Sequence, residues 1–143
     1  MSITCIGLKG FKPSDIQPIL ARAAWVLDLR WSAPRPPYFT TKSLRALCNE
    51  LGVHFVALRE FGNPPFIRAL YKTDPDGMCR AYKDYITHLL KRNNSARNTF
   101  HAIRNKAAHA SVVFLCACPQ LRVDRGHCHT IWLKELITSD QRY

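Results

Sequence analysis

Ser111-Val-Val-Phe-Leu-Cys-Ala-Cys-Pro119 is the stretch of this sequence that decides the fold, because its residues from Val112 to Cys116 are apolar and partly β-branched. Such a short run is typical of a strand buried on both faces in a parallel sheet. A basic turn follows, and the spacing of apolar residues from Cys128 to Ile137 then predicts a helix. In open α/β sheets, ligands bind beyond the carboxyl ends of the strands. We therefore expect the functional site where this strand ends.

Other segments upstream have a similar character and predict three further strands. These strands are Ile3 to Leu8, Trp25 to Leu29 and Val53 to Leu58. Apolar side chains at helical spacing predict helices from Pro13, from Thr40 or Thr41 to Gly52, along Met78 to Leu89 and along Ala96 to Ala107. Strands that alternate with helices predict an α/β fold with a mainly parallel sheet of about four strands and helices on both faces. We expect residues 1–143 to form one three-layer domain.

The sequence is strongly basic, with 21 Lys and Arg against 10 Asp and Glu and a net charge of +11. No acidic residue occurs between Tyr85 and Val123. This balance favours nucleic acid or another polyanion as partner, although a solvated basic surface would have the same composition. We expect no membrane partner, because no apolar run approaches the roughly 20 residues that a spanning helix needs. The N-terminus lacks a secretory signal pattern, which predicts the cytoplasm and reduced thiols.

Cations and aromatic residues gather near the predicted strand ends and on one helix. The residues that we expect to bind phosphate or nucleic acid are Lys9, Trp31, Arg35, Arg97, Arg104, Arg122 and Arg125. They predict a protein that binds nucleic acid or a nucleotide-like phosphate and that could also modify its ligand. Arg97 and Arg104 share one helix face, which leaves a further alternative, a non-catalytic basic subunit that docks on an acidic protein or an RNA.

Candidate catalytic residues lie at the same strand ends, and they are Asp28, Arg30, Cys116, Cys128 and His129. A thiol beside an imidazole at a helix N-terminus has the surroundings that lower a thiol pKa, which suggests a cysteine-dependent redox or transfer enzyme as an alternative function. A carboxylate at a strand end is a position typical of general bases. The alternative is that these residues have only structural roles, the cysteines as buried free thiols and Asp28 and Arg30 as a simple ion pair.

We expect no cofactor from these candidate residues, and a bound zinc ion is the alternative. Its ligands would be Cys116, Cys118 and Cys128 with His127 or His129, because three sulfurs and one nitrogen make an acceptable tetrahedral set. The Cys-x-Cys spacing is unusual for structural zinc. Side chains two residues apart also share a face only if the strand continues that far.

Several segments match, in order and spacing, a pattern known from one family. They are Ile6-Gly7-Leu8-Lys9, Asp28-Leu29-Arg30-Trp31-Ser32-Ala33-Pro34, Tyr82-Lys83-Asp84-Tyr85, Cys116-Ala117-Cys118 and Cys128-His129-Thr130. On these residues the chain resembles the domain-of-unknown-function family 488. The resemblance implies a small α/β fold and a candidate site, with no assigned activity. The chain departs from the family at three polar positions, where Lys9, Cys118 and Thr130 replace a serine, a glutamate and an arginine.

Overall fold

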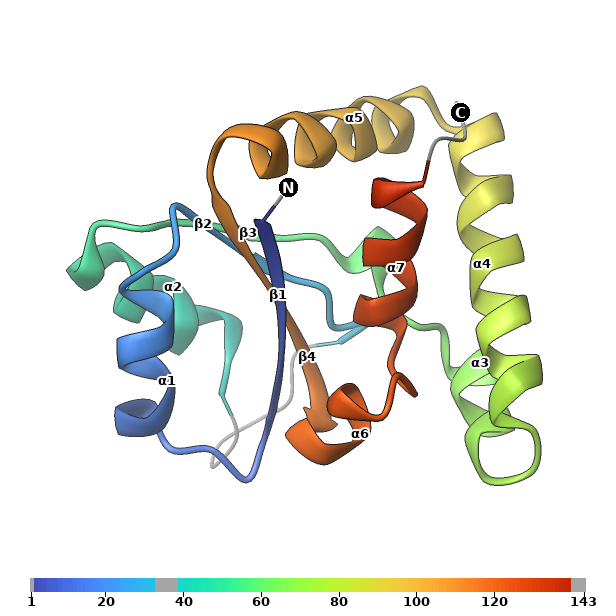
Figure 1. The fold of residues 1–143 in the computed structure, drawn as a ribbon, viewed down its shortest axis with the longest axis horizontal. Helices are drawn as coiled ribbons and strands as arrows, with labels where there is room; N and C mark the ends of the chain where they lie inside the picture. The colour runs from blue at the N-terminus through green and yellow to red at the C-terminus, as the bar shows by residue number, and fades with distance from the viewer. Residues whose placement is uncertain (1, 33–38, 140–143) are drawn as a thin grey trace.

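The computed structural model describes residues 2–32 and 39–139, and this part of the chain contains a sheet of four parallel strands (Figure 1). The strand order is β1-β4-β2-β3, so the last strand in sequence lies between the first and the second. The elements, with η for a 3-10 helix, are β1 (Ser2–Lys9), α1 (Pro13–Leu20), β2 (Trp25–Asp28), α2 (Thr41–Leu51), β3 (His54–Ala57), η1 (Arg59–Phe61), α3 (Pro65–Arg68), η2 (Ala69–Lys72), α4 (Pro75–Arg92), α5 (Asn94–His109), β4 (Ser111–Pro119), α6 (Gln120–Asp124) and α7 (His129–Thr138).

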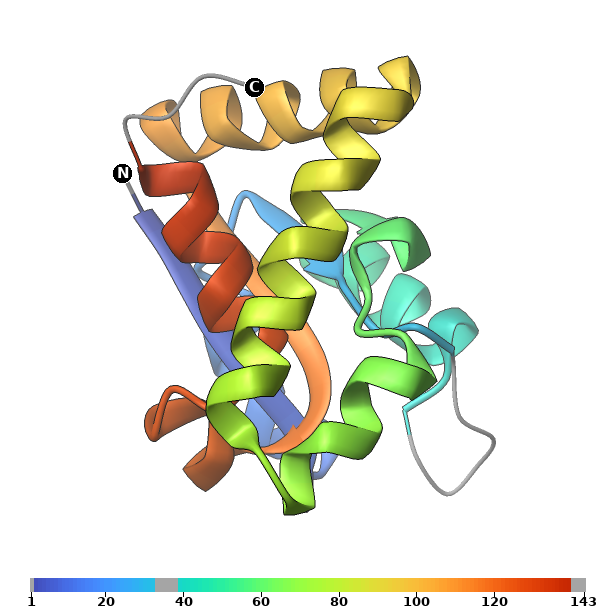
Figure 2. The same cartoon turned by 90° about the vertical axis from the view of Figure 1, so that its right-hand side faces the viewer.

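Helices cover both faces of the sheet and make three layers (Figure 1). On one face α1 and α2 pack against Val113 and Leu115 of β4. On the other face α4, α5 and α7 surround Phe114, and Figure 2 shows α4 and α7 side by side in front of the sheet. The expected α/β fold with a parallel sheet is therefore confirmed. None of the helices within residues 2–32 and 39–139 is long and apolar enough to cross a membrane.

Local signals predicted both ends of α2. The hydroxyl of Thr40 accepts a hydrogen bond from the backbone N–H of Ser43 at 3.0 Å, and the Ser43 hydroxyl accepts one from the Thr40 N–H at 2.9 Å. This reciprocal pair satisfies two N–H groups that the helix itself leaves unpaired. Gly52 ends the helix with a φ of 69°, a conformation that favours glycine.

β4 is longer than the sequence predicts, because it continues past Cys116 to Pro119. Its pairing with β1 shifts register between Gly7 and Lys9. A Cβ at Gly7 would lie 2.2 Å from the carbonyl oxygen of Cys118, so the two backbones approach closely only because residue 7 has no side chain. The extension places Cys118 on a strand rather than in a loop.

The segment between β3 and α4 also differs from the prediction. The prolines at 64 and 65 predicted only a break in the chain, yet η1, α3 and η2 form there. Pro65 is the first residue of α3, a position where the missing N–H of proline has no helical partner to lose. These short helices bring Arg68 and Lys72 to the carboxyl end of the sheet.

Candidate functional site

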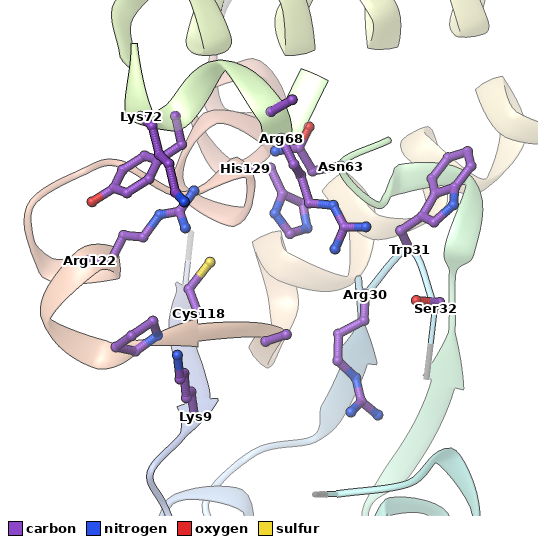
Figure 3. Close-up of a pocket in the computed structure, with 14 residues that line it drawn as sticks. Lys9, Arg30, Trp31, Ser32, Asn63, Arg68, Lys72, Cys118, Arg122 and His129 are labelled. Carbon is purple, nitrogen blue, oxygen red and sulfur yellow. The ribbon is translucent and has the colours of Figure 1, made fainter. Parts of the chain in front are cut away.

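The carboxyl ends of β1, β2 and β4, together with the segment that follows β3, line one cavity of about 550 Å³ (Figure 3). β1 and β2 lead into helices on one face of the sheet, whereas β4, which lies between them, leads into α7 on the other face. Neighbouring connections therefore diverge, and such a switch point is where open α/β sheets bind ligands. The polar and aromatic residues that line the cavity are Lys9, Arg30, Trp31, Ser32, Asn63, Arg68, Tyr71, Lys72, Cys118, Arg122 and His129.

The cavity wall is positively charged. Its cationic residues are Lys9, Arg30, Arg68, Lys72 and Arg122, and none of the lining residues within the described ranges is Asp or Glu. Arg30 is paired with Asp28, but Lys9, Arg68 and Lys72 form no ion pair with any residue that the structure describes. The cavity thus concentrates positive charge that no lining carboxylate offsets.

Arg122 is held in place by contacts on two sides. Its Nε donates to the carbonyl oxygen of His127 at 2.9 Å, and its Nη2 approaches the sulfur of Met78 at 3.9 Å. The guanidinium carbon lies 3.6 Å from the centre of the Tyr71 ring. Stacking on an aromatic face leaves the edge of a guanidinium free to donate, so Arg122 is positioned to bind an anion in the cavity.

Asn63 contributes an unpaired polar atom to the cavity wall. The residue is 3% exposed, and its Oδ1 has no hydrogen-bond partner among the described residues. A buried oxygen that lacks a donor destabilises a fold by about 1–3 kcal/mol. We therefore expect a ligand or a water molecule in the cavity to donate a hydrogen bond to Asn63 Oδ1.

Asp28 and Arg30 form a buried ion pair at the end of β2. The Arg30 Nε and Nη2 donate to the two carboxylate oxygens of Asp28 at 2.8 and 2.7 Å, and Nη1 donates to the carbonyl oxygen of Phe39 at 2.5 Å. Both residues are at most 5% exposed, and in Figure 3 Arg30 points away from Arg68 and His129. This geometry favours the ion-pair alternative over catalytic roles for the two residues.

A cluster of three cysteines lies beside the cavity. The sulfur atoms of Cys116, Cys118 and Cys128 all lie within 4.8 Å of one another. Cys116 and Cys118 share a face of β4 because the strand continues to Pro119, and Cys128 is the N-cap of α7. Cys118 lines the cavity, whereas Cys116 and Cys128 are buried. The structure thus brings together the three sulfurs that the sequence suggested.

The three thiols differ in acidity. Hydrogen bonds from Cys116 and Cys118, with further ones from Thr130, hold the pKa of the Cys128 thiol well below its usual value in spite of burial. The hydrogen bond with Cys116 lowers the pKa of Cys118, but the bond with Cys128 and burial outweigh it and raise that pKa. Hydrogen bonds with Cys118 and Cys128, together with burial, raise the pKa of Cys116 well above its usual value.

This distribution of acidity bears on the hypothesis of a cysteine nucleophile. Cys128 is the thiol most readily ionised in the cluster, but only 1% of it is exposed. Cys118 faces the cavity, yet its raised pKa keeps it protonated near neutral pH. The arrangement therefore does not favour attack by a thiolate on a ligand in the cavity, and the cysteine-dependent enzyme stays an untested prediction.

His129 connects the end of β2 to the thiol cluster. Its Nε2 lies 2.7 Å from the carbonyl oxygen of Leu29 and must donate to it, since that oxygen can only accept. Burial lowers the pKa of the imidazole, so the ring is neutral and Nδ1 carries a lone pair. That Nδ1 lies 3.7 Å from the sulfur of Cys128. His129 is therefore a ready acceptor or ligand beside the cluster.

The alternative with His127 as the fourth zinc ligand stays a prediction. The ring of His127 packs edge-on against Tyr71, with ring centres 6.4 Å apart, and it is not part of the sulfur group. His127 immediately precedes Cys128, the N-cap of α7. His129 is also outside that group, but its Nδ1 lies 3.7 Å from the sulfur of Cys128.

The two arginines on α5 have structural partners away from the cavity. Arg97 Nε donates to the carbonyl oxygen of Leu90 at 2.9 Å, and Arg104 Nε donates to that of Ile137 at 2.9 Å. These carbonyls lie in the last turns of α4 and α7, where no helical donor remains for them. α5 also lies at the opposite end of the sheet from α6 (Figure 1). The structure therefore does not bring these arginines to the site, and a docking role for α5 stays a prediction.

Of the other predicted phosphate ligands, Lys9, Trp31 and Arg122 line the cavity. Arg125 is exposed at the end of α6 and does not line it, and Arg35 lies outside the described residues. Sequence reasoning missed the residues that the segment after β3 contributes, which are Asn63, Arg68, Tyr71 and Lys72. The sequence did hold a signal for this segment. Pro65 is typical of a helix start, and Arg68 and Lys72 follow it four residues apart, a spacing that places two side chains on one helix face.

Comparison with known proteins identifies a family for this chain. The sequence profile of the domain of unknown function DUF488 matches residues 20–137. The curated proteins and the solved structures give no match. The matched span runs from the last residue of α1 into α7 and so includes the cysteine cluster and most of the cavity wall. On this match the chain belongs to the DUF488 family.

Proposed function

We propose that this protein binds a nucleotide-type ligand, with a phosphate group placed among Lys9, Arg68 and Lys72. The observation that supports this most is the convergence of cations on a cavity whose described lining residues include no carboxylate. Like charges held close together disfavour one another, and a bound anion relieves that repulsion. Arginine and lysine also give phosphate its strongest hydrogen bonds, because both partners are charged.

The remaining lining residues suit the base and sugar of a nucleotide. Trp31 is 36% exposed and Tyr71 is partly exposed, so both offer aromatic surface on which a base can stack. The Asn63 amide offers hydrogen bonds at the same wall. A cavity of about 550 Å³ falls in the usual size range of small-molecule sites. The ligand could be a free nucleotide or the end of a single strand, whose remaining phosphates would lie on the basic surface.

Titration with labelled nucleotides and short single strands tests this function. We expect Arg68→Ala combined with Lys72→Ala to weaken binding at least about tenfold, because two charge-assisted hydrogen bonds are lost. Arg22→Ala combined with Arg92→Ala is the matched control, since it removes the same charge from exposed positions outside the cavity. The affinity of this control variant should stay within about twofold of the wild-type affinity. Binding by the wild-type protein should fall steeply as salt is raised from about 50 to 200 mM.

The outcomes of this titration separate the two sources of the ligand. Tighter binding of a strand than of a mononucleotide would identify nucleic acid as the ligand, and equal affinities would identify the free nucleotide. Undiminished binding by the Arg68 and Lys72 double variant would remove the proposal, as would equal losses in the control.

We infer that the protein works in a reducing compartment such as the cytoplasm. All six cysteines are free thiols, including the three whose sulfurs lie within 4.8 Å of one another. In an oxidising compartment, thiols this close would be expected to form disulfides. Cell fractionation followed by thiol counting on the isolated protein checks the inference.

A further inference from the structure

We propose that Cys116, Cys118 and Cys128 hold a zinc ion in the wall of the cavity, with Nδ1 of His129 as the fourth ligand. This site is separate from the proposed nucleotide site and does not rest on it. The sulfurs come from two elements, the end of β4 and the start of α7, which lie far apart in sequence and meet only in the folded chain.

The distances between the sulfurs suit a tetrahedral ion. Zinc–sulfur bonds of about 2.3 Å place the sulfurs of a tetrahedral site about 3.8 Å apart, and a nitrogen about 3.6 Å from each of them. The three sulfurs already lie within 4.8 Å of one another, and His129 Nδ1 lies 3.7 Å from the sulfur of Cys128. His129 is not part of the mutual 4.8 Å group, so binding would draw its ring toward β4.

The groups around the cluster match those that surround metal ligands. A histidine bound to metal normally donates its second N–H to a carbonyl or carboxylate, which fixes the tautomer and the ring orientation. His129 Nε2 is hydrogen-bonded to the carbonyl oxygen of Leu29 at 2.7 Å, which leaves Nδ1 as the metal-binding atom. Thr130 Oγ1 donates to the sulfur of Cys128 at 3.3 Å, the kind of bond that supports a thiolate ligand.

The charges and the chemistry of the site also favour zinc. Three thiolates and one Zn²⁺ leave a net charge of −1, which the N-terminus of α7 and the nearby Arg122 can stabilise. Zinc binding would replace the weak bond that the Cys116 thiol makes with the Ile6 carbonyl oxygen at 3.7 Å. Soft sulfur ligands together with imidazole select zinc over magnesium or calcium.

Elemental analysis of the full chain, purified under reducing conditions and dialysed against chelator, tests the site. We expect about one zinc per wild-type chain and less than about a tenth of that in Cys118→Ser and Cys128→Ser. Cys48→Ser and Cys79→Ser are the matched controls, because these cysteines lie outside the cluster, and they should keep the metal. Retention of zinc by Cys118→Ser, or equal loss in the controls, would overturn the proposal.

Loss of metal could also follow from misfolding, and a stability measurement separates the two. Cys118 is only partly buried, so Cys118→Ser should unfold at the same temperature as metal-free wild-type protein. Added zinc should raise the unfolding temperature of the wild type and leave that of the variant unchanged, because only a folded site binds the ion. Equal responses in the two proteins would contradict the site.

Cobalt substitution tests the fourth ligand. Co²⁺ bound by the wild type should show thiolate charge-transfer absorption and the intense d–d bands of a tetrahedral ion. His129→Gln should keep the charge-transfer absorption and shift the d–d bands, because sulfur ligation stays and nitrogen ligation is lost. Unchanged d–d bands would remove His129 from the ligand set. A wild type that binds neither zinc nor cobalt, or that forms a Cys116–Cys128 disulfide instead, would overturn the whole proposal, whatever the result with nucleotides.

Discussion

The ion pair between Asp28 and Arg30 is buried at the end of β2, and its partners depend on each other. Asp28→Ala would leave the Arg30 guanidinium buried without its carboxylate. We expect this change to lower the free energy of unfolding by about 3–5 kcal/mol. Urea denaturation measures the loss, and Asp84→Ala, at an exposed position, should stay within about 0.5 kcal/mol of wild type. Similar losses at the two positions would show that the ion pair has no special role.

Cys48 lies on α2 with no exposed surface, and burial raises its pKa from the ordinary value of 9.0 to about 11. As pH rises past 9, the unfolded chain releases this proton before the folded chain does. The contribution of Cys48 to stability is therefore complete below about pH 9 and is lost as pH rises toward 11. Urea denaturation at several pH values should show a smaller decline in Cys48→Ala than in wild type, and parallel declines would contradict this prediction.

Single residues show where sequence reasoning reached the site and where it stopped. Cys116 and Cys128 were identified because thiols at a strand end and a helix start are chemically conspicuous, and the structure brings their sulfurs together. Asn63 was missed, since nothing in the sequence shows that one amide oxygen is buried without a donor. The sequence left His127 and His129 as alternatives because both flank Cys128, and only the folded chain shows that His129 Nδ1 lies 3.7 Å from the Cys128 sulfur.

Gly7 controls how β1 and β4 fit together. A Cβ at this position would meet the Cys118 carbonyl oxygen at 2.2 Å and the Pro119 carbonyl carbon at 2.9 Å, which are backbone atoms that cannot rotate away. We expect Gly7→Ala to cost about 1–3 kcal/mol of stability and to push Cys118 out of the cluster. Urea denaturation and the alkylation rate of Cys118 measure the two effects. Thr4→Ala, at an exposed position on the same strand, is the control and should change neither.

At the level of elements, sequence predicted what local signals determine. The Thr40 cap and Gly52 lie within or beside α2 itself, so both ends of that helix could be recognised. The end of β4 could not, because residues 117–119 are held in the strand by their pairing with β1 across the register shift. Pro65, in contrast, is a local signal for the start of α3 that the sequence prediction did not use.

The net charge of +11 acts on the whole molecule. Like charges repel one another in the compact state, and salt screens that repulsion. We therefore expect the free energy of unfolding to rise between about 10 and 150 mM NaCl, while the affinity for a phosphate-bearing ligand falls over the same range. Urea denaturation and ligand titration in the same buffers give both quantities. A fall in stability with salt would mean that attractive ion pairs outweigh the net repulsion.

The central position of β4 has a consequence for the synthesis of the chain. β1 pairs only with β4 among the described strands, and β4 ends at Pro119, late in the sequence. While the ribosome is making residues 10–110, β1 has no partner in the sheet, so β2 and β3 can pair before β1 joins them. The four-stranded sheet is completed only when the last quarter of the chain emerges and β4 pairs with β1 and β2. The cysteine cluster can form beside the cationic cavity only at that stage. A nascent chain of this architecture therefore exposes an unpaired apolar strand for most of its translation, the kind of surface that chaperones bind.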